Sequence, residues 1–291
     1  MPHSIRRRTV LALPMALQPL RAAAAPSLGY SLYGLKTLPW RDSLDICSKL
    51  GYASVELALM PGYGIPAAEY SDFRKMLGDT GLQLAGVMDN LQLLAAGDSH
   101  SQNLERLKAA RDAAEQLGTN VVESILGGKP GEFDANKAQM QERLGDWARV
   151  FDGSKVMLAL KAHVMQATQQ PEQLRSLLAA VNHPALKAAY DYSHFLAQGL
   201  DMEETVKTLA PYIVFVHIKD VSSKPPVRFF APGTGGTDYK KLAGLLADNG
   251  YSGSAVVEIS AQIHNAPGFD PYRAVRECRD KLCSAFTCAT R

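Results

Sequence analysis

Residues 156–164 read VMLALKAHV, an apolar run that ends on a lysine and, two positions later, a histidine. A near-continuous apolar run of this length is typical of a strand buried on both faces, as in a parallel sheet covered by helices. Similar short runs recur along the chain. We therefore predict eight strands, over residues 27–33, 54–59, 82–88, 120–126, 156–162, 186–192, 213–219 and 254–260.

Longer stretches with helical spacing separate these runs. Leu104, Leu107, Ala110, Ala114 and Leu117 recur at intervals of three and four residues, as one buried face of a helix requires. Eight strand-helix units predict an α/β fold, a single (β/α)8 TIM barrel. An open doubly wound sheet would be expected to carry a glycine-rich turn after its first strand, where this sequence has one glycine in SLYGL. Glycines expected to end helices are Gly51, Gly81, Gly118 and Gly250.

The first 24 residues differ from the rest of the chain. They contain three consecutive arginines, a short apolar stretch and an alanine-rich run that suits a cleavage site. The stretch RRTVL (7–11) resembles the twin-arginine pattern of export signals. We therefore expect residues 1–24 to be a twin-arginine export signal and residues 25–291 to form the barrel, in the periplasm. A basic tail or a membrane anchor is the alternative.

The formal net charge of +2 comes from this first segment, which carries four arginines and no acid. The remaining chain has 27 basic and 29 acidic residues, so its surface offers no electrostatic footprint for nucleic acid. No second long apolar segment suggests a membrane domain. The sequence gives no indication of the oligomeric state.

None of the cysteines shows the two-residue spacing of a zinc knuckle or a thioredoxin-like site. Export would permit disulfides. If the first and last helices lie side by side, the first cysteine could reach one near the C-terminus, and unpaired thiols are the alternative. The cysteines are Cys47, Cys278, Cys283 and Cys288.

The last four predicted strands end on polar residues, and in a TIM barrel the functional site lies at these strand ends. Two imidazoles with two carboxylates make a ligand set for Mn²⁺, Mg²⁺, Co²⁺, Fe²⁺ or Zn²⁺. Buried carboxylates require a bound cation or a salt-bridge network, and a lysine could be that partner. The strand-end residues are Lys161, His163, Asp191, His194, His217 and Glu258.

This arrangement resembles the xylose isomerase-like TIM-barrel superfamily of sugar isomerases and epimerases. The resemblance implies that a divalent ion is held by a Glu, an Asp, a His and a Glu at the ends of the fifth to eighth strands. Asp191, His217 and Glu258 fall on the last three of these places. The stretches that carry it are LGYASVELAL (50–59), LKAAYDYSHFLAQGLD (186–201), IVFVHIKD (213–220) and FAPGTGGTDYKKLAGLLADNGYSGSAVVEIS (230–260).

The fifth strand departs from the family pattern. Relatives commonly have E-N-H or E-P where this chain has KAH (161–163). Three alternatives remain open: His163 replaces the carboxylate as a ligand, or the ion is lost and Lys161 neutralises the neighbouring acids, or His194 fills the gap. Residues two apart on a strand share a face, which favours the first alternative.

In the resembling enzymes, two glutamates move a proton through an enediolate while the ion grips neighbouring substrate oxygens. We therefore expect an exported, metal-dependent isomerase or epimerase, or a related lyase or dehydratase, that acts on a carbohydrate or cyclitol by proton abstraction next to a carbonyl. Glu258 would be one base. Either Lys161 acts as the other, with a pKa lowered by the ion, or the chemistry uses one face of the substrate only, which suits isomerisation or loss of water better than epimerisation. A non-catalytic carbohydrate-binding barrel is the alternative, motivated by the missing glutamate.

Other polar residues near the rim are candidates for substrate contacts. His194 and Glu56 could bind substrate hydroxyls, and Arg228 lies in a long loop suited to a clamp. The alternative for Glu56 is a salt bridge inside the barrel, and for Arg228 a solvated loop charge. Glu123, in the fourth strand, is a minor candidate.

Overall fold

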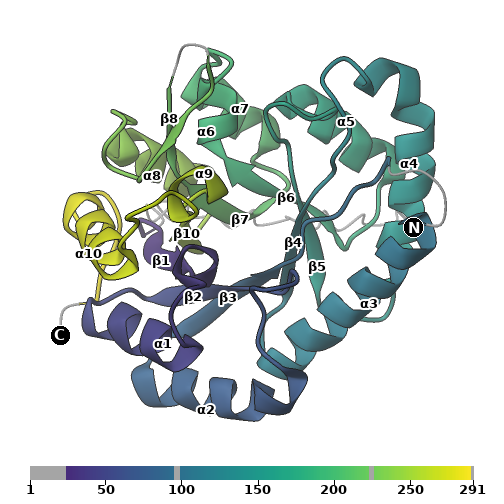
Figure 1. Cartoon of the computed structure of the whole chain (residues 1–291). Helices are drawn as coiled ribbons and strands as arrows, with labels where there is room; N and C mark the ends of the chain where they lie inside the picture. The colour runs from purple at the N-terminus through teal and green to yellow at the C-terminus, as the bar shows by residue number, and fades with distance from the viewer. Residues whose placement is uncertain (1–23, 95–98, 223–225, 290–291) are drawn as a thin grey trace, which may run out of the picture.

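The computed structural model describes residues 24–94, 99–222 and 226–289. Eight parallel strands close into a barrel in the order β1-β10-β7-β6-β5-β4-β3-β2, and helices surround it (Figure 1). The predicted (β/α)8 barrel is therefore confirmed. The strands are β1 (Ser27–Ser31), β2 (Ser54–Ala58), β3 (Gln83–Met88), β4 (Val121–Ile125), β5 (Met157–Lys161), β6 (Leu186–Asp191), β7 (Ile213–Ile218) and β10 (Ser254–Val257).

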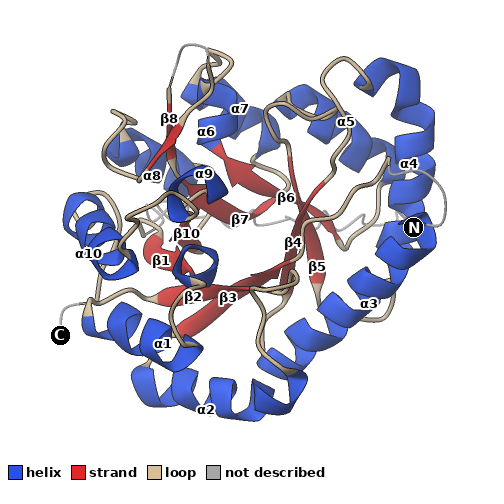
Figure 2. Ribbon diagram, in the orientation of Figure 1, coloured by secondary structure: helices blue, strands red, loops and turns tan. Residues whose placement is uncertain are grey.

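Helices follow the strands as the three-and-four spacing predicted, and together they form the outer layer (Figure 2). The predicted glycine caps are confirmed: Gly81, for example, ends α2 at a φ of 70°, in the left-handed region. The long helices are α1 (Trp40–Lys49), α2 (Tyr70–Thr80), α3 (Ser99–Leu117), α4 (Phe133–Arg149), α5 (Pro171–Val181), α7 (Met202–Leu209), α8 (Tyr239–Asp248) and α10 (Pro271–Leu282). Short ones are η1 (Leu32–Leu35), η2 (Ala67–Glu69), α6 (Tyr192–Leu196) and α9 (Ala261–His264).

An apolar plug fills part of the barrel interior. Phe215 is its largest member, and Gly86 on β3 makes room for the ring, because a Cβ at Gly86 would lie 3.1 Å from Phe215 Cε2. The other buried members are small or branched, as barrel interiors prefer. The plug consists of Val121, Ala159, Ala189, Phe215 and Val256.

A two-stranded hairpin interrupts the connection that follows β7. Its strands, β8 (Asp220–Val221) and β9 (Phe229–Phe230), pair antiparallel. The Asp220 carboxylate accepts hydrogen bonds from the N–H groups of Thr234 and Gly235, at 2.9 and 2.8 Å. The hairpin was not predicted, because its strands are too short to give a period-two pattern.

Of the two alternatives for Cys47, the structure shows the unpaired thiol. The structure has one disulfide among its described residues, between Cys283 and Cys288, whose Cα atoms are 5.6 Å apart. Helices α1 and α10 do lie side by side, but Cys47 and Cys278 remain free and buried. Burial raises the pKa of both thiols, that of Cys278 to about 12, so neither is a reactive thiolate.

Reduction of this disulfide is expected to lower the free energy of unfolding by about 2 kcal/mol, since the bridge closes a short loop and restricts the unfolded chain. The loop also carries Thr287, which bonds the backbone of Leu28 on β1. Urea denaturation with and without reductant measures the effect. A variant with both bridge cysteines changed to serine is the control and should not respond to reductant; equal stability of oxidised and reduced wild type would contradict the prediction.

The expected export signal lies outside the described residues, apart from Ala24. Among the residues that the structure describes, no helix has the length and apolar character needed to cross a membrane.

Candidate active site at the barrel mouth

Acidic and basic side chains from five strands, and from the residues just beyond the ends of β7 and β10, meet inside the barrel. All are buried, and the most exposed side chain, that of Glu258, has an exposed fraction of only 10%. The five strands are β2, β4, β5, β6 and β7, so the group exists only once the barrel has closed. We call it the acid–lysine cluster: Glu56, Glu123, Lys161, Asp191, His217, Lys219 and Glu258.

The Lys161 ammonium lies at the centre of this cluster. Its Nζ is 3.1 Å from Glu123 Oε1 and 3.0 Å from Glu258 Oε2. The same atom is 4.0 Å from Asp191 Oδ2 and 2.7 Å from His217 Nδ1. Burial by itself would lower the pKa of Lys161, but the surrounding carboxylates outweigh it and raise the pKa above its ordinary value. The carboxylates thus favour the ammonium form of Lys161, which opposes its expected role as a base; that role stays a prediction.

Lys219 is a second buried cation, which the sequence analysis did not single out. Its Nζ lies 3.1 Å from both Asp191 Oδ2 and Glu258 Oε2, and 5.0 Å from the ring centroid of Phe229 on β9. Burial alone would raise the pKa of both carboxyls, but Lys161 and Lys219 hold the pKa of Glu258 well below its usual range. Lys219 and His194 do the same for Asp191. Both acids are therefore carboxylates.

His217 connects Lys161 to Glu56. His217 Nε2 lies 2.9 Å from Glu56 Oε2, and Ser31 Oγ donates to the same oxygen at 2.5 Å. Burial alone would lower the pKa of His217, but the carboxylates of Glu56 and Glu258 outweigh it and raise the pKa to about 9. The protonated ring donates from Nε2 to Glu56 and from Nδ1 to Glu258 Oε2 at 3.0 Å, whereas a neutral ring would accept from Lys161 at Nδ1. This pairing supports the interpretation of Glu56 as a buried polar contact inside the barrel rather than a residue that binds substrate.

His163 and His194 form a pair beside the cluster. Their ring centroids are 3.8 Å apart, and His194 Nε2 lies 3.3 Å from Asp191 Oδ2. His163 Nδ1 instead contacts the carbonyl oxygen of Val164 at 2.6 Å, so that nitrogen is not turned toward the cluster. Burial lowers the pKa of both imidazoles, that of His194 to about 4, and Lys219 adds to the effect. Both rings are neutral at ordinary pH.

Arg228 is exposed in the connection between β8 and β9. Its backbone pairs with Ser222: Arg228 N–H donates to Ser222 Oγ at 3.0 Å, and Ser222 N–H donates to Arg228 O at 2.8 Å. This placement favours a solvated loop charge over a substrate clamp.

Two groups of side chains within the described residues could hold a metal ion: Glu56, Glu123 and His217, and Asp191, His217 and Glu258. Each offers three ligand atoms that lie within 4.8 Å of one another. Carboxylate oxygen and imidazole nitrogen suit a divalent ion, as the sequence predicted.

The Lys161 ammonium, however, occupies the space between these ligands. It lies within 4.0 Å of a side-chain atom of every member of the second group, and it also contacts Glu123 of the first. An ion bonded at about 2.0 to 2.2 Å to the second group would lie against this ammonium. The donor types fit a divalent ion, but the space between them does not.

A sequence model of the xylose isomerase-like TIM barrel family matches residues 44–281, most of the chain. The protein belongs to the xylose isomerase-like TIM barrel family. This confirms the resemblance that the strand ends indicated, with Asp191, His217 and Glu258 brought together as a group.

Known members of the fold include enzymes. The chain is 24% identical over 213 residues to a 3-dehydroshikimate dehydratase of Bacillus anthracis, which covers 69% of this chain and 75% of that protein. Among solved structures, the IolI protein with a bound zinc atom has a TM-score of 0.74 at 18% identity, over 90% of this chain and 99% of that one. The 3-keto-D-glucoside 4-epimerase of E. coli has a TM-score of 0.72 at 14% identity, over 89% and 99%.

Aromatic side chains lie at the rim beside the end of β10. Tyr33 stacks on Tyr63 at 4.6 Å between ring centroids and meets the His264 ring edge-on at 4.6 Å. Gly34 lets η1 approach this strand end, because a Cβ there would lie 2.8 Å from Ile259 Cβ. Ile259 directly follows Glu258, so this close approach sets the wall next to the most exposed acid of the cluster.

Gly34→Ala is expected to lower the free energy of unfolding by about 1–3 kcal/mol, because the new methyl group would overlap Ile259 and neither backbone can yield freely. Gly78→Ala, inside α2 with open space around it, is the matched control and should raise stability by about 0.5–1 kcal/mol. Thermal or urea unfolding measures both. A Gly34→Ala protein as stable as wild type would contradict the packing described here.

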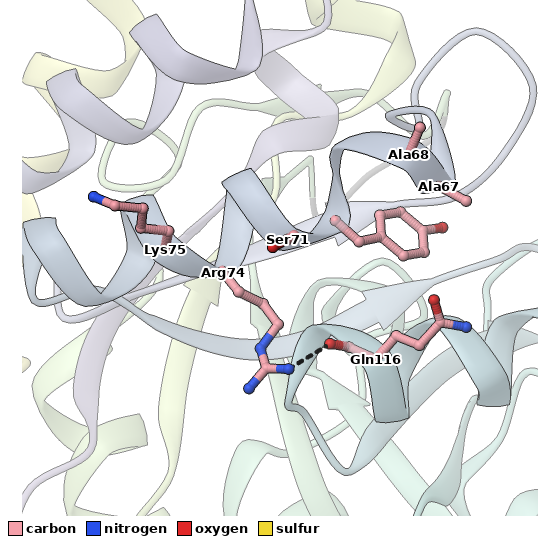
Figure 3. Close-up of a pocket in the computed structure, with 7 residues that line it drawn as sticks. Ala67, Ala68, Ser71, Arg74, Lys75 and Gln116 are labelled. Atoms are coloured by element: carbon pink, nitrogen blue, oxygen red, sulfur yellow. Dashed lines mark hydrogen bonds between the residues drawn. The ribbon is translucent and has the colours of Figure 1, made fainter.

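A surface hollow of about 540 Å³ lies on the outer helical layer, between η2, α2 and the end of α3. Figure 3 shows Arg74 reaching across it, where Nη1 donates to the carbonyl oxygen of Gln116 at 3.1 Å. Its walls contain neither an acid nor an imidazole. We therefore place the candidate site at the barrel mouth and not in this hollow.

Proposed function

We propose that the protein is an enzyme that removes a proton from the carbon next to a carbonyl in a small hydroxylated substrate, a carbohydrate or cyclitol. The single observation that carries this proposal is the placement of Glu258. Its carboxylate is the most exposed side chain of the cluster, and it lies 3.0 and 3.1 Å from two ammonium groups. A base beside fixed positive charge suits the formation of an enolate.

In this mechanism the Glu258 carboxylate accepts the proton from carbon, and the C–H electrons move onto the carbonyl oxygen. Positive charge from Lys161 and Lys219 stabilises the resulting enolate. The enolate electrons then form a double bond to the next carbon and expel its hydroxyl group. That hydroxyl group takes up a proton and leaves as water. His194, neutral and 3.3 Å from Asp191, is our candidate for passing that proton. In isomerisation no hydroxyl leaves: the enolate oxygen takes up a proton, the hydroxyl on the neighbouring carbon gives up its proton to become the new carbonyl, and Glu258 returns its proton to the former carbonyl carbon.

Two features favour water loss or isomerisation over an epimerisation that works from both faces. The usual strand-5 glutamate is replaced by Lys161, which holds its proton, so Glu258 is the most exposed carboxylate of the acid–lysine cluster. A relative at 24% identity carries the name of a dehydratase. Metal dependence remains a prediction: the donor types support it, and the position of Lys161 opposes it.

A panel of ketoses, 3-keto-glycosides, keto-cyclitols and hydroxylated cyclic ketones, incubated in D₂O and followed by NMR, tests the proposal. We expect deuterium to enter at the carbon next to the carbonyl, with water loss visible as the ultraviolet absorbance of a conjugated ketone. Binding of a panel member without any exchange would instead support a non-catalytic carbohydrate-binding barrel, which the neutralisation of the acids by lysines also favours.

We further propose that the protein is exported to the periplasm through the segment 1–24. The basis is the twin-arginine pattern of the sequence. Cell fractionation together with N-terminal sequencing of the mature protein tests this; recovery of the full-length chain from the cytoplasm alone would contradict it.

A further inference from the structure

We infer that the Lys161 ammonium is the resident cation of this site and stands where the family resemblance places a divalent metal ion. The inference deepens the proposed function, and any role of the Lys161 ammonium in catalysis rests on that function. The claim that Lys161 excludes a metal ion rests on the contacts of the acid–lysine cluster alone. It predicts that the wild-type protein excludes divalent ions.

The charge of the site supports this replacement. In the resembling enzymes the end of the fifth strand supplies a glutamate, and the ion supplies two positive charges. A carboxylate and a divalent ion together carry one positive charge, and a lysine ammonium carries the same. Lys161 is the last residue of β5. One substitution at this position can therefore remove a ligand and keep the charge that compensates the acids.

The contacts of Lys161 support the replacement independently of charge. His217 Nδ1, whose lone pair a metal would need, lies 2.7 Å from Lys161 Nζ and 3.0 Å from Glu258 Oε2. Glu258 Oε2 contacts the same ammonium at 3.0 Å. Two donors of the candidate metal group are thus already engaged by the lysine, and Lys219 engages the third, Asp191, at 3.1 Å.

The surroundings also hold Lys161 in place. Its side chain has an exposed fraction of 3%, and the apolar plug built around Phe215 fills another part of the barrel interior. Withdrawal from the cluster would leave several buried carboxylates without compensation, which is strongly unfavourable. A divalent ion would therefore have to displace a cation that the fold retains.

The first measurement uses the untagged wild-type chain, incubated with excess Zn²⁺, Mn²⁺ or Co²⁺, desalted and analysed for metal. We expect far less than one ion per chain and no shift of Tm by the ions or by EDTA. Retention of roughly one ion per chain, lost in Asp191→Ala, would overturn the inference.

The second measurement restores the carboxylate with Lys161→Glu. Because this variant regains a ligand and loses the ammonium, we expect it to retain roughly one ion per chain, and its Tm should rise with Co²⁺. Lys161→Gln is the matched control, since it removes the charge without adding a carboxylate, and should retain much less. The double variant Lys161→Glu/Asp191→Ala should lose the ion again.

A folded Lys161→Glu protein that retains no more metal than wild type would count against the inference, because the lysine would then not be what excludes the ion. If Lys161→Glu does not fold, the wild-type metal measurement still decides the matter. Neither measurement needs a substrate. If the proposed function is wrong, no member of the panel will exchange deuterium. The metal measurements can still be interpreted in that case.

Discussion

Lys161→Met is expected to lower the free energy of unfolding by about 3–5 kcal/mol, because it removes one partner of a buried ionic network and leaves the others uncompensated. Methionine keeps much of the shape of the side chain, so the loss reports charge and hydrogen bonding more than volume. Glu123 and Glu258 would lose contacts of 3.1 and 3.0 Å with the ammonium group. Urea denaturation monitored by circular dichroism measures the change.

Lys207→Met is the matched control. Lys207 pairs with Glu203 at 2.6 Å on the exposed face of α7, with an exposed fraction of 63%, so its removal should not change stability measurably. Adding Glu123→Gln to Lys161→Met should recover part of the loss, since one uncompensated carboxylate is then removed. Equal stability of Lys161→Met and wild type would show that the ammonium is not held by the cluster.

Glu258→Gln is expected to lower kcat/KM by about 10²- to 10⁴-fold on the substrate that the panel identifies, because an amide cannot accept the proton from carbon. The amide oxygen can still accept from Lys161 and Lys219, so the loss should exceed any effect on the fold. Deuterium exchange at the carbon next to the carbonyl should fall together with turnover.

Glu203→Gln, at an exposed position in the first turn of α7, is the control and should leave turnover unchanged. Thermal unfolding of both variants separates a catalytic loss from misfolding. Full deuterium exchange by a folded Glu258→Gln protein would assign the base to another residue and remove the main support for the proposed mechanism.

The architecture was predictable from the sequence because the signals that specify it are local. The run VMLALKA is a buried strand whether or not its neighbours are known, and residues 157–161 do form β5. The same holds for the helical spacing from Leu104 to Leu117, which lies within α3. Eight such units in alternation leave few topologies, and strand ends in a barrel share one rim. Asp191, His217 and Glu258 could therefore be placed together before any coordinates.

Tertiary structure alone decided what the residues of the rim do. Sequence spacing showed that Lys161 and His163 are two apart, but His163 Nδ1 turns to a backbone carbonyl, and Lys161 takes the centre. Lys219 was overlooked although it follows His217 by two positions, because its acids come from β6 and β10, far away in the chain. Burial lowers the pKa of Lys161 and several carboxylates raise it, so the direction of the shift depends on the balance of these effects. That balance exists only when the barrel is closed.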